Sequence, residues 1–212
     1  PTKNSTWLEL DKILDKEYHF SNGKTLKVAR TFIDSGFSTD EVYRYCESRQ
    51  IKGCFAIKGR GGSGLSLLHQ FGKPKNANII LVILAVDTGK AEIFSRLAIE
   101  KGLPKSFHFP LDDELERGYD EIYFKELIAE RLTAKKSGGV INMVWEKIQA
   151  KSRNESLDIR NYNLAAMKSC YGNLEPSKFW EMQAAALREG DTSTETKKSP
   201  AKIVSRAIDI YN

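Results

Sequence analysis

The chain contains the run Ile79-Ile80-Leu81-Val82-Ile83-Leu84-Ala85-Val86, which is followed at once by Asp87-Thr88-Gly89. The run is apolar throughout and rich in β-branched side chains, as is typical of a strand that is buried on both faces. A strand of this kind belongs in the middle of a sheet whose faces are covered. The run therefore favours an α/β fold with helices on the faces of the sheet.

Outward from this run, patterns typical of strands and helices alternate along the chain. Further strands are expected over residues 26–33, 53–58, 65–71, 106–109 and 140–145. Helices are expected over residues 7–14, 40–50, 91–101, 120–132, 154–168 and 177–187. The alternation predicts a single α/β domain over residues 1–189.

The last part of the chain differs in composition from this domain. Residues 190–200 are polar, rich in threonine and poor in apolar side chains, which is typical of a linker. Residues 201–210 have apolar side chains near helical spacing. We therefore expect residues 190–212 to form a linker and a C-terminal tail that could carry a docking helix.

Composition excludes several classes of protein. No apolar run reaches the length of a membrane span, and residues 1–10 lack the pattern of a signal peptide. The three cysteines and three histidines are scattered, which argues against a structural zinc site and fits a reducing cytosol. Because the chain begins with Pro1, we expect a fragment or a processed product. The net charge of +5 permits nucleic-acid binding without requiring it.

Two predicted strands end in the same local pattern. Asp34 is followed by Ser35-Gly36, and Asp87 is followed by Thr88-Gly89. Ligands of open α/β sheets gather at the carboxyl ends of strands, and two carboxylates there would repel each other unless a cation lay between them. A single aspartate in this place often only caps the following turn. The repeated pattern makes Asp34 and Asp87 candidate ligands of a hard cation, magnesium or manganese.

A third acidic element lies on the helix expected over residues 154–168. Glu155 and Asp158 are three residues apart and so share one helical face, while Asn154, Asp158 and Asn161 form a polar stripe. Glu155 also suits the positive end of the helix dipole, which needs no metal. Asp158 is harder to explain in this way, because aspartate is a poor residue for a helix interior. With Asp34 and Asp87, this element could form a two-metal site for phosphodiester hydrolysis.

Basic residues near these acids are candidates for binding phosphates. Lys58 directly precedes a glycine-rich loop over residues 59–64, Arg60 lies within this loop, and Lys151 and Arg153 precede Asp158. The loop itself could contact a DNA phosphate or could simply be a flexible connection between strands.

At these residues the sequence resembles the endonuclease domain of lambda-like phage terminase large subunits. The similar stretches occur in the family's order over about residues 28 to 170, and the ordered set is more specific than any one of them. They are Phe32–Gly36, Thr39–Tyr43, Phe55–Gly59, Val86–Lys90 with Ile93, Arg96 and Leu97, Phe107–Pro110, Tyr119–Asp120 with Phe124 and Leu127, and Asn154–Glu155 with Leu157–Asp158. The chain departs from the expected pattern at Gly89, where a more helix-forming residue is expected.

The resemblance implies a ribonuclease-H-like mixed sheet with helices on both faces. It implies cleavage of concatemeric double-stranded viral DNA with two Mg²⁺ or Mn²⁺ ions, and it makes Asp34, Asp87 and Asp158 the metal-binding catalytic acids, with Glu155 a further possible ligand. It also implies the terminase small subunit and the portal protein as partners, and the host cytoplasm as the location. The packaging ATPase domain of the family is not expected here, because no G-x-x-x-x-G-K-[ST] motif is present.

Two alternatives remain open at this point. The chain could be another ribonuclease-H-like nuclease, such as a junction resolvase. It could also be a non-catalytic DNA-binding or docking module in which the acids are only caps.

Overall fold

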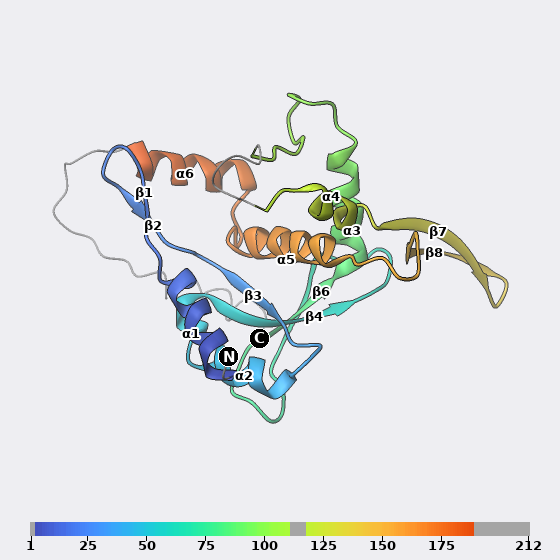
Figure 1. Cartoon of the computed structure of the whole chain (residues 1–212), viewed down its shortest axis with the longest axis horizontal. Coiled ribbons are helices and arrows are strands. Elements are labelled where there is room, and N and C mark those ends of the chain that lie inside the picture. Colours follow the sequence, from blue (N-terminus) through green and yellow to red (C-terminus); the bar gives the residue numbers. More distant parts are fainter. Residues whose placement is uncertain (1–2, 111–117, 189–212) are drawn as a thin grey trace. The chain divides into compact units, whose positions relative to one another are not determined.

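The computed structural model describes residues 3–110 and 118–188 (Figure 1). The described residues form two compact units. Unit 1 takes in residues 3–57, 71–81 and 166–188, and unit 2 takes in residues 58–70, 82–110 and 118–165. The expected linker and tail over residues 190–212 lie outside the described residues.

Six α-helices are described: α1 (Lys3–Leu14), α2 (Thr39–Glu47), α3 (Val86–Leu97), α4 (Glu121–Leu127), α5 (Glu155–Ser169) and α6 (Pro176–Arg188). The strands are β1 (Tyr18–His19), β2 (Thr25–Leu26), β3 (Thr31–Asp34), β4 (Cys54–Arg60), β5 (Leu68–Gly72), β6 (Leu81–Ala85), β7 (Glu130–Ser137) and β8 (Val140–Lys147). A short 3₁₀ helix, η1 (Gln50–Lys52), precedes β4.

A four-stranded mixed sheet has the order β3-β4-β6-β5. β3 pairs with β4 in parallel, with Thr31 opposite Cys54 and Asp34 opposite Ile57. The apolar run forms β6, in which Val82, Leu84 and Ala85 are buried as expected for a central strand. The α/β class predicted from the sequence is therefore confirmed.

The strand of the apolar run ends earlier than expected. β6 stops at Ala85, and α3 begins at Val86 without a connecting loop. The helix expected over residues 91–101 thus begins five residues earlier and ends at Leu97. As a consequence, Asp87 lies in the first turn of a helix, where a carboxylate is stabilised by the amide groups of the helix N-terminus.

The prediction of a helix over residues 120–132 is wrong for the second half of that range. α4 ends at Leu127, and residues 130–137 form β7, which pairs antiparallel with β8. Gly138 and Gly139 both have positive φ and form the two-residue turn that a hairpin favours. Cross-strand pairing therefore overrides the local helical pattern.

The short strand expected over residues 106–109 does not form. Its aromatic residues instead enter a cluster within unit 2, in which the ring of Phe109 contacts those of Phe107, Tyr119 and Phe124 at centroid distances of 5.8, 5.7 and 5.1 Å. Side-chain packing takes the place of sheet pairing here.

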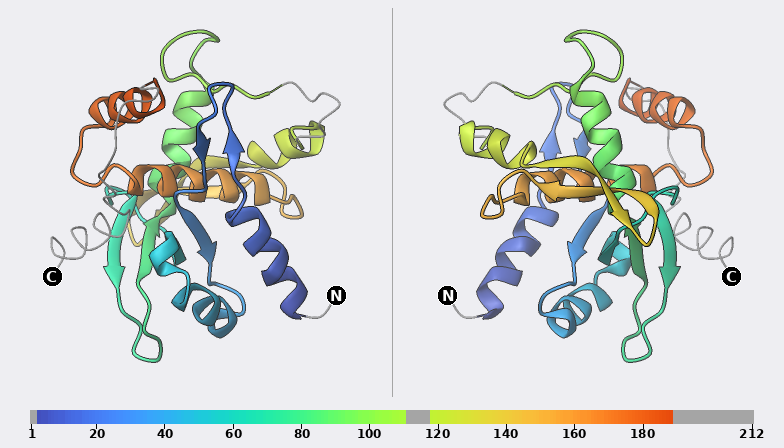
Figure 2. Two further views of the ribbon diagram at one scale, coloured as in Figure 1. Left: turned by 90° about the vertical axis from the view of Figure 1, so that its left-hand side faces the viewer. Right: turned by 90° about the vertical axis from the view of Figure 1, so that its right-hand side faces the viewer.

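The core of unit 1 lies between the first helices and strands β3 and β4. Figures 1 and 2 show α1 and α2 beside β3. The buried side chains are Val42, Tyr45, Cys46, Cys54, Ala56 and Ile79. Trp7 of α1 stacks on the ring of Tyr45 with a centroid distance of 4.4 Å, which fixes α1 against α2.

A polar network completes the contact between α1 and α2. The guanidinium of Arg49 donates two hydrogen bonds of 2.6 Å to the Asp11 carboxylate, and the Tyr45 hydroxyl donates a third of 2.8 Å. The hydrogen bonds from Arg49 hold the pKa of Asp11 below its ordinary value. Desolvation and the same carboxylate raise the pKa of Tyr45.

Replacing Arg49 by methionine is expected to lower the free energy of unfolding by about 1 kcal/mol at neutral pH, as for a well-formed, partly exposed ion pair. Because the pKa of Asp11 is lowered in the folded state, its contribution is complete above the ordinary aspartate pKa and is lost as the pH falls through the folded-state pKa. The difference between wild type and variant in urea denaturation should therefore shrink below about pH 3.9. A difference that stays constant down to pH 2 would contradict this assignment.

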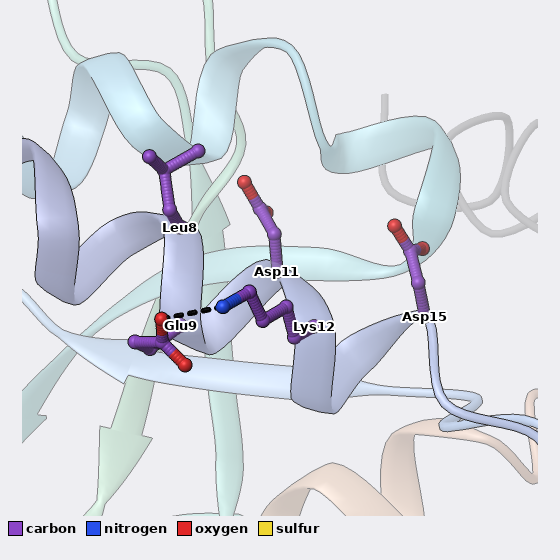
Figure 3. A pocket seen from close by; sticks show the side chains of 5 residues that line it. All are labelled: Leu8, Glu9, Asp11, Lys12 and Asp15. Carbon is purple, nitrogen blue, oxygen red and sulfur yellow. Dashed lines mark hydrogen bonds and ion pairs between the residues drawn. The ribbon is translucent and has the colours of Figure 1, made fainter.

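The helix α1 also lines a shallow pocket (Figure 3). Its lining residues are Leu8, Glu9, Asp11, Lys12 and Asp15. Lys12 donates a 2.6 Å hydrogen bond to Glu9, and Asp11 belongs to the network with Arg49. None of the predicted site residues lines this pocket.

Among the helices of residues 3–110 and 118–188, none is long and apolar enough to cross a membrane.

Candidate active site

Asp87 is held in place by the glycine-rich loop. Its Oδ2 atom accepts a 2.8 Å hydrogen bond from the backbone amide of Gly62, and the Thr88 hydroxyl donates a 2.7 Å bond to the carbonyl of Leu65. Gly62 has a φ of +131°, a conformation that side chains disfavour. The loop therefore has a role that the sequence did not suggest, because it orients the second predicted acid.

A second cluster within unit 2, the Lys90 network, consists of Lys90, Glu130, Asn154 and Asp158. Lys90, one turn after Asp87, places its ammonium 2.8 and 3.0 Å from the two carboxylate oxygens of Glu130. Only 10% of the Lys90 side chain and 6% of the Glu130 side chain are exposed. A buried pair of this kind needs further hydrogen bonds to offset the desolvation of both charges.

Asp158 joins this network from α5. Its Oδ1 lies 3.5 Å from the Lys90 ammonium, and its Oδ2 accepts a 3.1 Å hydrogen bond from the side-chain amide of Asn154. The same amide donates a 2.6 Å bond to Glu130. Asn154 directly precedes α5, and its carbonyl accepts the amide of Asp158. The first turn of α5 therefore fixes Asp158 beside a buried ion pair.

The electrostatics of the network raise the pKa of Asp158. Desolvation is the largest cause, the nearby Lys90 ammonium opposes it, and the charges of Glu130 and Glu155 add to it. Two carboxylates, Glu130 and Asp158, share one ammonium, so the network keeps one excess negative charge. An additional cation beside Asp158 would stabilise its ionised form.

These residues fit a hard divalent cation in ligand type and in charge. The donors near Asp158 are oxygens, which Mg²⁺ and Mn²⁺ prefer, and the network carries excess negative charge. Within residues 3–110 and 118–188, no three His, Cys, Asp or Glu side chains are grouped as a ready-made metal site.

The remaining predicted acids lie in different settings. Asp34 ends β3 in unit 1, is exposed, and accepts a 2.9 Å hydrogen bond from the amide of Gly36. This bond is the turn-capping contact that a strand-end aspartate commonly makes. Asp87 and Asp158 both belong to unit 2. Glu155 is exposed at the first position of α5 and raises the pKa of Asp158 through its charge.

The predicted basic residues are mostly accessible. Lys58 is partly buried near the end of β4, and Arg60 is exposed with its guanidinium 3.4 Å from the His69 ring. Lys151 is exposed, and 74% of the Arg153 side chain is exposed, although its Nε lies 3.3 Å from Glu126. The exposed side chains of Arg60, Lys151 and Arg153 are accessible to phosphates.

The unexpected glycine at position 89 has a steric reason. Gly89 is buried in α3, and a Cβ atom there would lie 1.7 Å from the Asn161 Oδ1 and 2.9 Å from a methyl group of Leu67. Asn161 is 1% exposed, and its amide donates a 2.9 Å bond to the carbonyl of Val86. Gly89 thus allows α5 to approach α3 closely enough for Asn161 to bind the backbone just before Asp87.

Replacing Gly89 by alanine should therefore destabilise the protein, although alanine usually stabilises a helix. We expect a loss of about 1–3 kcal/mol in the free energy of unfolding, as for an overpacked core. Gly72→Ala is the matched control, because the Cβ added there meets nothing within 4 Å. Adding Asn161→Ala to Gly89→Ala should cost less than the sum of the two single changes. A stabilised Gly89→Ala variant in urea denaturation would exclude the close packing.

Comparison with known proteins identifies the family. The model of the family described as "Terminase large subunit gpA, endonuclease domain" matches residues 1–177. The chain belongs to this family. The resemblance noted from the sequence is thereby confirmed.

Two curated relatives are similar over nearly the whole chain. The terminase large subunit of Enterobacteria phage P21 is 24% identical over 224 residues, which cover 100% of this chain and 33% of that protein. The terminase large subunit of Escherichia phage lambda is 26% identical over 205 residues, which cover 92% of this chain and 30% of that protein. The chain spans about a third of the length of these relatives. No solved structure matches.

Two members of the Lys90 network of this terminase endonuclease domain were missed by sequence reasoning. Glu130 was placed inside an expected helix, and Lys90 was noted only as part of the family pattern. The signal that could have found Glu130 is the pair Gly138-Gly139, which predicts a hairpin and so makes residue 130 the start of a strand. Lys90 and Glu130 contact each other but are 40 residues apart in the sequence.

Proposed function

We propose that this domain is a metal-dependent endonuclease that cleaves concatemeric double-stranded viral DNA during genome packaging. The proposal includes a ribonuclease-H-like arrangement of the sheet and helices. It is carried by one observation: the endonuclease family matches residues 1–177, which include Asp34, Asp87 and Asp158. The geometry of unit 2 supports it, because Asp87 and Asp158 are both held by hydrogen bonds at the first turns of helices.

The three aspartates are the proposed metal ligands and catalytic acids, with Glu155 beside Asp158 as a further ligand. Two Mg²⁺ or Mn²⁺ ions would activate the attacking water and stabilise the leaving oxygen. The amide of Gly62 and the amide of Asn154 fix the carboxylates of Asp87 and Asp158, respectively. Lys90 opposes the rise in the pKa of Asp158 that desolvation and the charge of Glu130 cause, and so favours the ionised form that a metal ligand needs.

Accessible basic residues supply the proposed DNA contacts. Lys58, Arg60, Lys151 and Arg153 would bind phosphates, so binding should be independent of sequence and should weaken steeply with salt. As part of a terminase large subunit, the domain would work with the terminase small subunit and the portal protein in the host cytoplasm.

The metal requirement gives a direct test. The domain should nick or linearise supercoiled plasmid in Mg²⁺ or Mn²⁺ and lose this activity in excess EDTA, because oxygen ligands bind these ions. Ca²⁺ should bind without supporting fast cleavage, since its looser coordination positions water poorly. Full activity in EDTA would refute metal dependence.

The same assay addresses the two alternatives. A domain that binds duplex DNA but leaves plasmid intact in Mn²⁺ would be a non-catalytic module. A domain that cuts four-way junctions but not linear duplexes would be a resolvase.

A further inference from the structure

The hairpin of β7 and β8, called the wing below, grows directly out of the Lys90 network. Its first residue is Glu130, which is paired in register with Lys147 at the end of β8. Close to this base, Trp145 packs on Phe94 of α3 with a ring-centroid distance of 4.9 Å. The base of the wing is therefore anchored in unit 2, while Figure 1 shows its turn extending away from α3 and α4. Eight strand residues at about 3.3 Å each place the turn about 25 Å from Glu130.

One face of the wing carries several exposed apolar side chains, with Lys136 directly opposite Ile141 on the same face. Because side chains alternate along a strand, Leu132, Ile141 and Met143 lie on the same face as Glu130 and Trp145. At the base this face is covered, but farther out Leu132, Met143 and Ile141 are 45, 50 and 68% exposed. Val140, next to the turn and on the opposite face, is 60% exposed. An exposed apolar group at the end of a projecting hairpin indicates a binding surface.

The charge of the wing indicates the kind of partner. Arg131, Lys135, Lys136 and Lys147 are exposed basic residues of the two strands. The acids of the wing are Glu130, which is buried against Lys90, and Glu146, which pairs with Lys135. The accessible charge that remains is positive, which suits phosphates. Lys151, in the segment that follows β8, extends this basic surface toward α5.

We infer that the wing binds double-stranded DNA, with Ile141 and Met143 inserted into the minor groove and the basic residues on the flanking phosphates. Apolar side chains on a basic protein element can wedge between base pairs and kink the duplex. The inference rests on the proposed nuclease function and adds to it a contact at a distance from the cleaved bond. A reach of about 25 Å corresponds to about seven base pairs at about 3.4 Å each.

The test uses the whole chain with a 30-base-pair duplex labelled at both ends, in EDTA, so that binding is measured without cleavage. The wild type should bind and shorten the end-to-end distance measured by energy transfer. The double variant Ile141→Ser/Met143→Ser should abolish the kink and weaken binding about tenfold, as expected for two apolar side chains that no longer become buried. Lys136→Ala should lower the slope of log affinity against log salt by about one contact, or about 0.9.

Two control variants test whether the loss of any exposed apolar or basic side chain would have the same effect on DNA binding. Ile122 of α4 is 66% exposed, and Ile122→Ser should leave both affinity and kink unchanged. Lys101→Ala is the control for charge. Thermal unfolding of each variant should match the wild type, because the substituted side chains are exposed.

Two results would overturn the inference. Wild-type affinity and kinking in Ile141→Ser/Met143→Ser would show that the wing does not enter DNA. A loss of self-association in that variant, with DNA binding retained, would assign the apolar face to a second copy of the chain. Plasmid cleavage in Mn²⁺, measured separately, tests the proposed function: an inactive wild type that still kinks DNA would refute the nuclease but not the wing.

Discussion

Replacing Asp87 by asparagine is expected to abolish plasmid cleavage while leaving the fold intact. Asparagine keeps the oxygen that accepts the Gly62 amide, so the loop over residues 59–64 should stay in place. It removes the charge that the proposed metal requires. Since changes around metal ligands alone cost about 10–100-fold in activity, loss of a ligand should cost at least about a hundredfold.

Asp120→Asn is the matched control for this change. Asp120 also accepts a backbone amide at the start of a helix, that of Tyr123 at 2.8 Å, and asparagine is an equally good cap. The control should cut plasmid at the wild-type rate, and the thermal midpoints of both variants should lie close to that of the wild type. Wild-type cleavage by Asp87→Asn in Mg²⁺ and Mn²⁺ would remove Asp87 from the site. The same comparison can be made for Asp34→Asn.

Replacing Lys90 by methionine should produce the largest loss of stability. Methionine fills a similar volume but leaves the Glu130 carboxylate, 6% exposed, without its cation. Breaking a buried pair in this way typically costs about 3–5 kcal/mol, which should appear in urea denaturation as a lower midpoint with an unchanged slope. Because Lys90 also faces Asp158, cleavage should fall even where the variant remains folded.

Two further variants make the Lys90 prediction specific. Adding Glu130→Gln removes the buried charge and should restore part of the lost stability. Lys125→Met is the control, because Lys125 pairs with Glu121 on the surface, where 72 and 81% of the side chains are exposed and an ion pair contributes little to stability. A loss in Lys90→Met no larger than in this control would show that the buried pair does not stabilise the fold.

The elements with strong local patterns were predictable. The apolar run at residues 79–86 identified the central strand, and the helix near residues 154–168 was placed to within a residue at each end. The region after Leu127 was not predictable in the same way. Its residues suit either a helix or a strand locally, and the choice is made by pairing with β8, in which Lys147 lies opposite Glu130 and Trp145 opposite Leu132.

The candidate site also has parts that could be predicted from the sequence and parts that could not. Asp34 and Asp87 were singled out because each was expected at the end of a strand, and Asp158 because aspartate is a poor residue for a helix interior. The glycine-rich loop was not assigned its role, because the contact between Gly62 and Asp87 joins residues 25 positions apart. Gly89 looked like a departure from the pattern for a similar reason: the atom that excludes a side chain belongs to Asn161 on another helix.

The sequence by itself determined the α/β class, the positions of the acids and the terminase endonuclease family, because these depend on local hydrophobicity and on ordered motifs. Only the tertiary structure decided that Lys90 pairs with Glu130, that Asn154 orients Asp158, and that a loop amide holds Asp87. The physical reason for the pairing of Lys90 with Glu130 is burial. A charge taken out of water needs partners nearby in space, and the folded chain brings those partners from distant parts of the sequence.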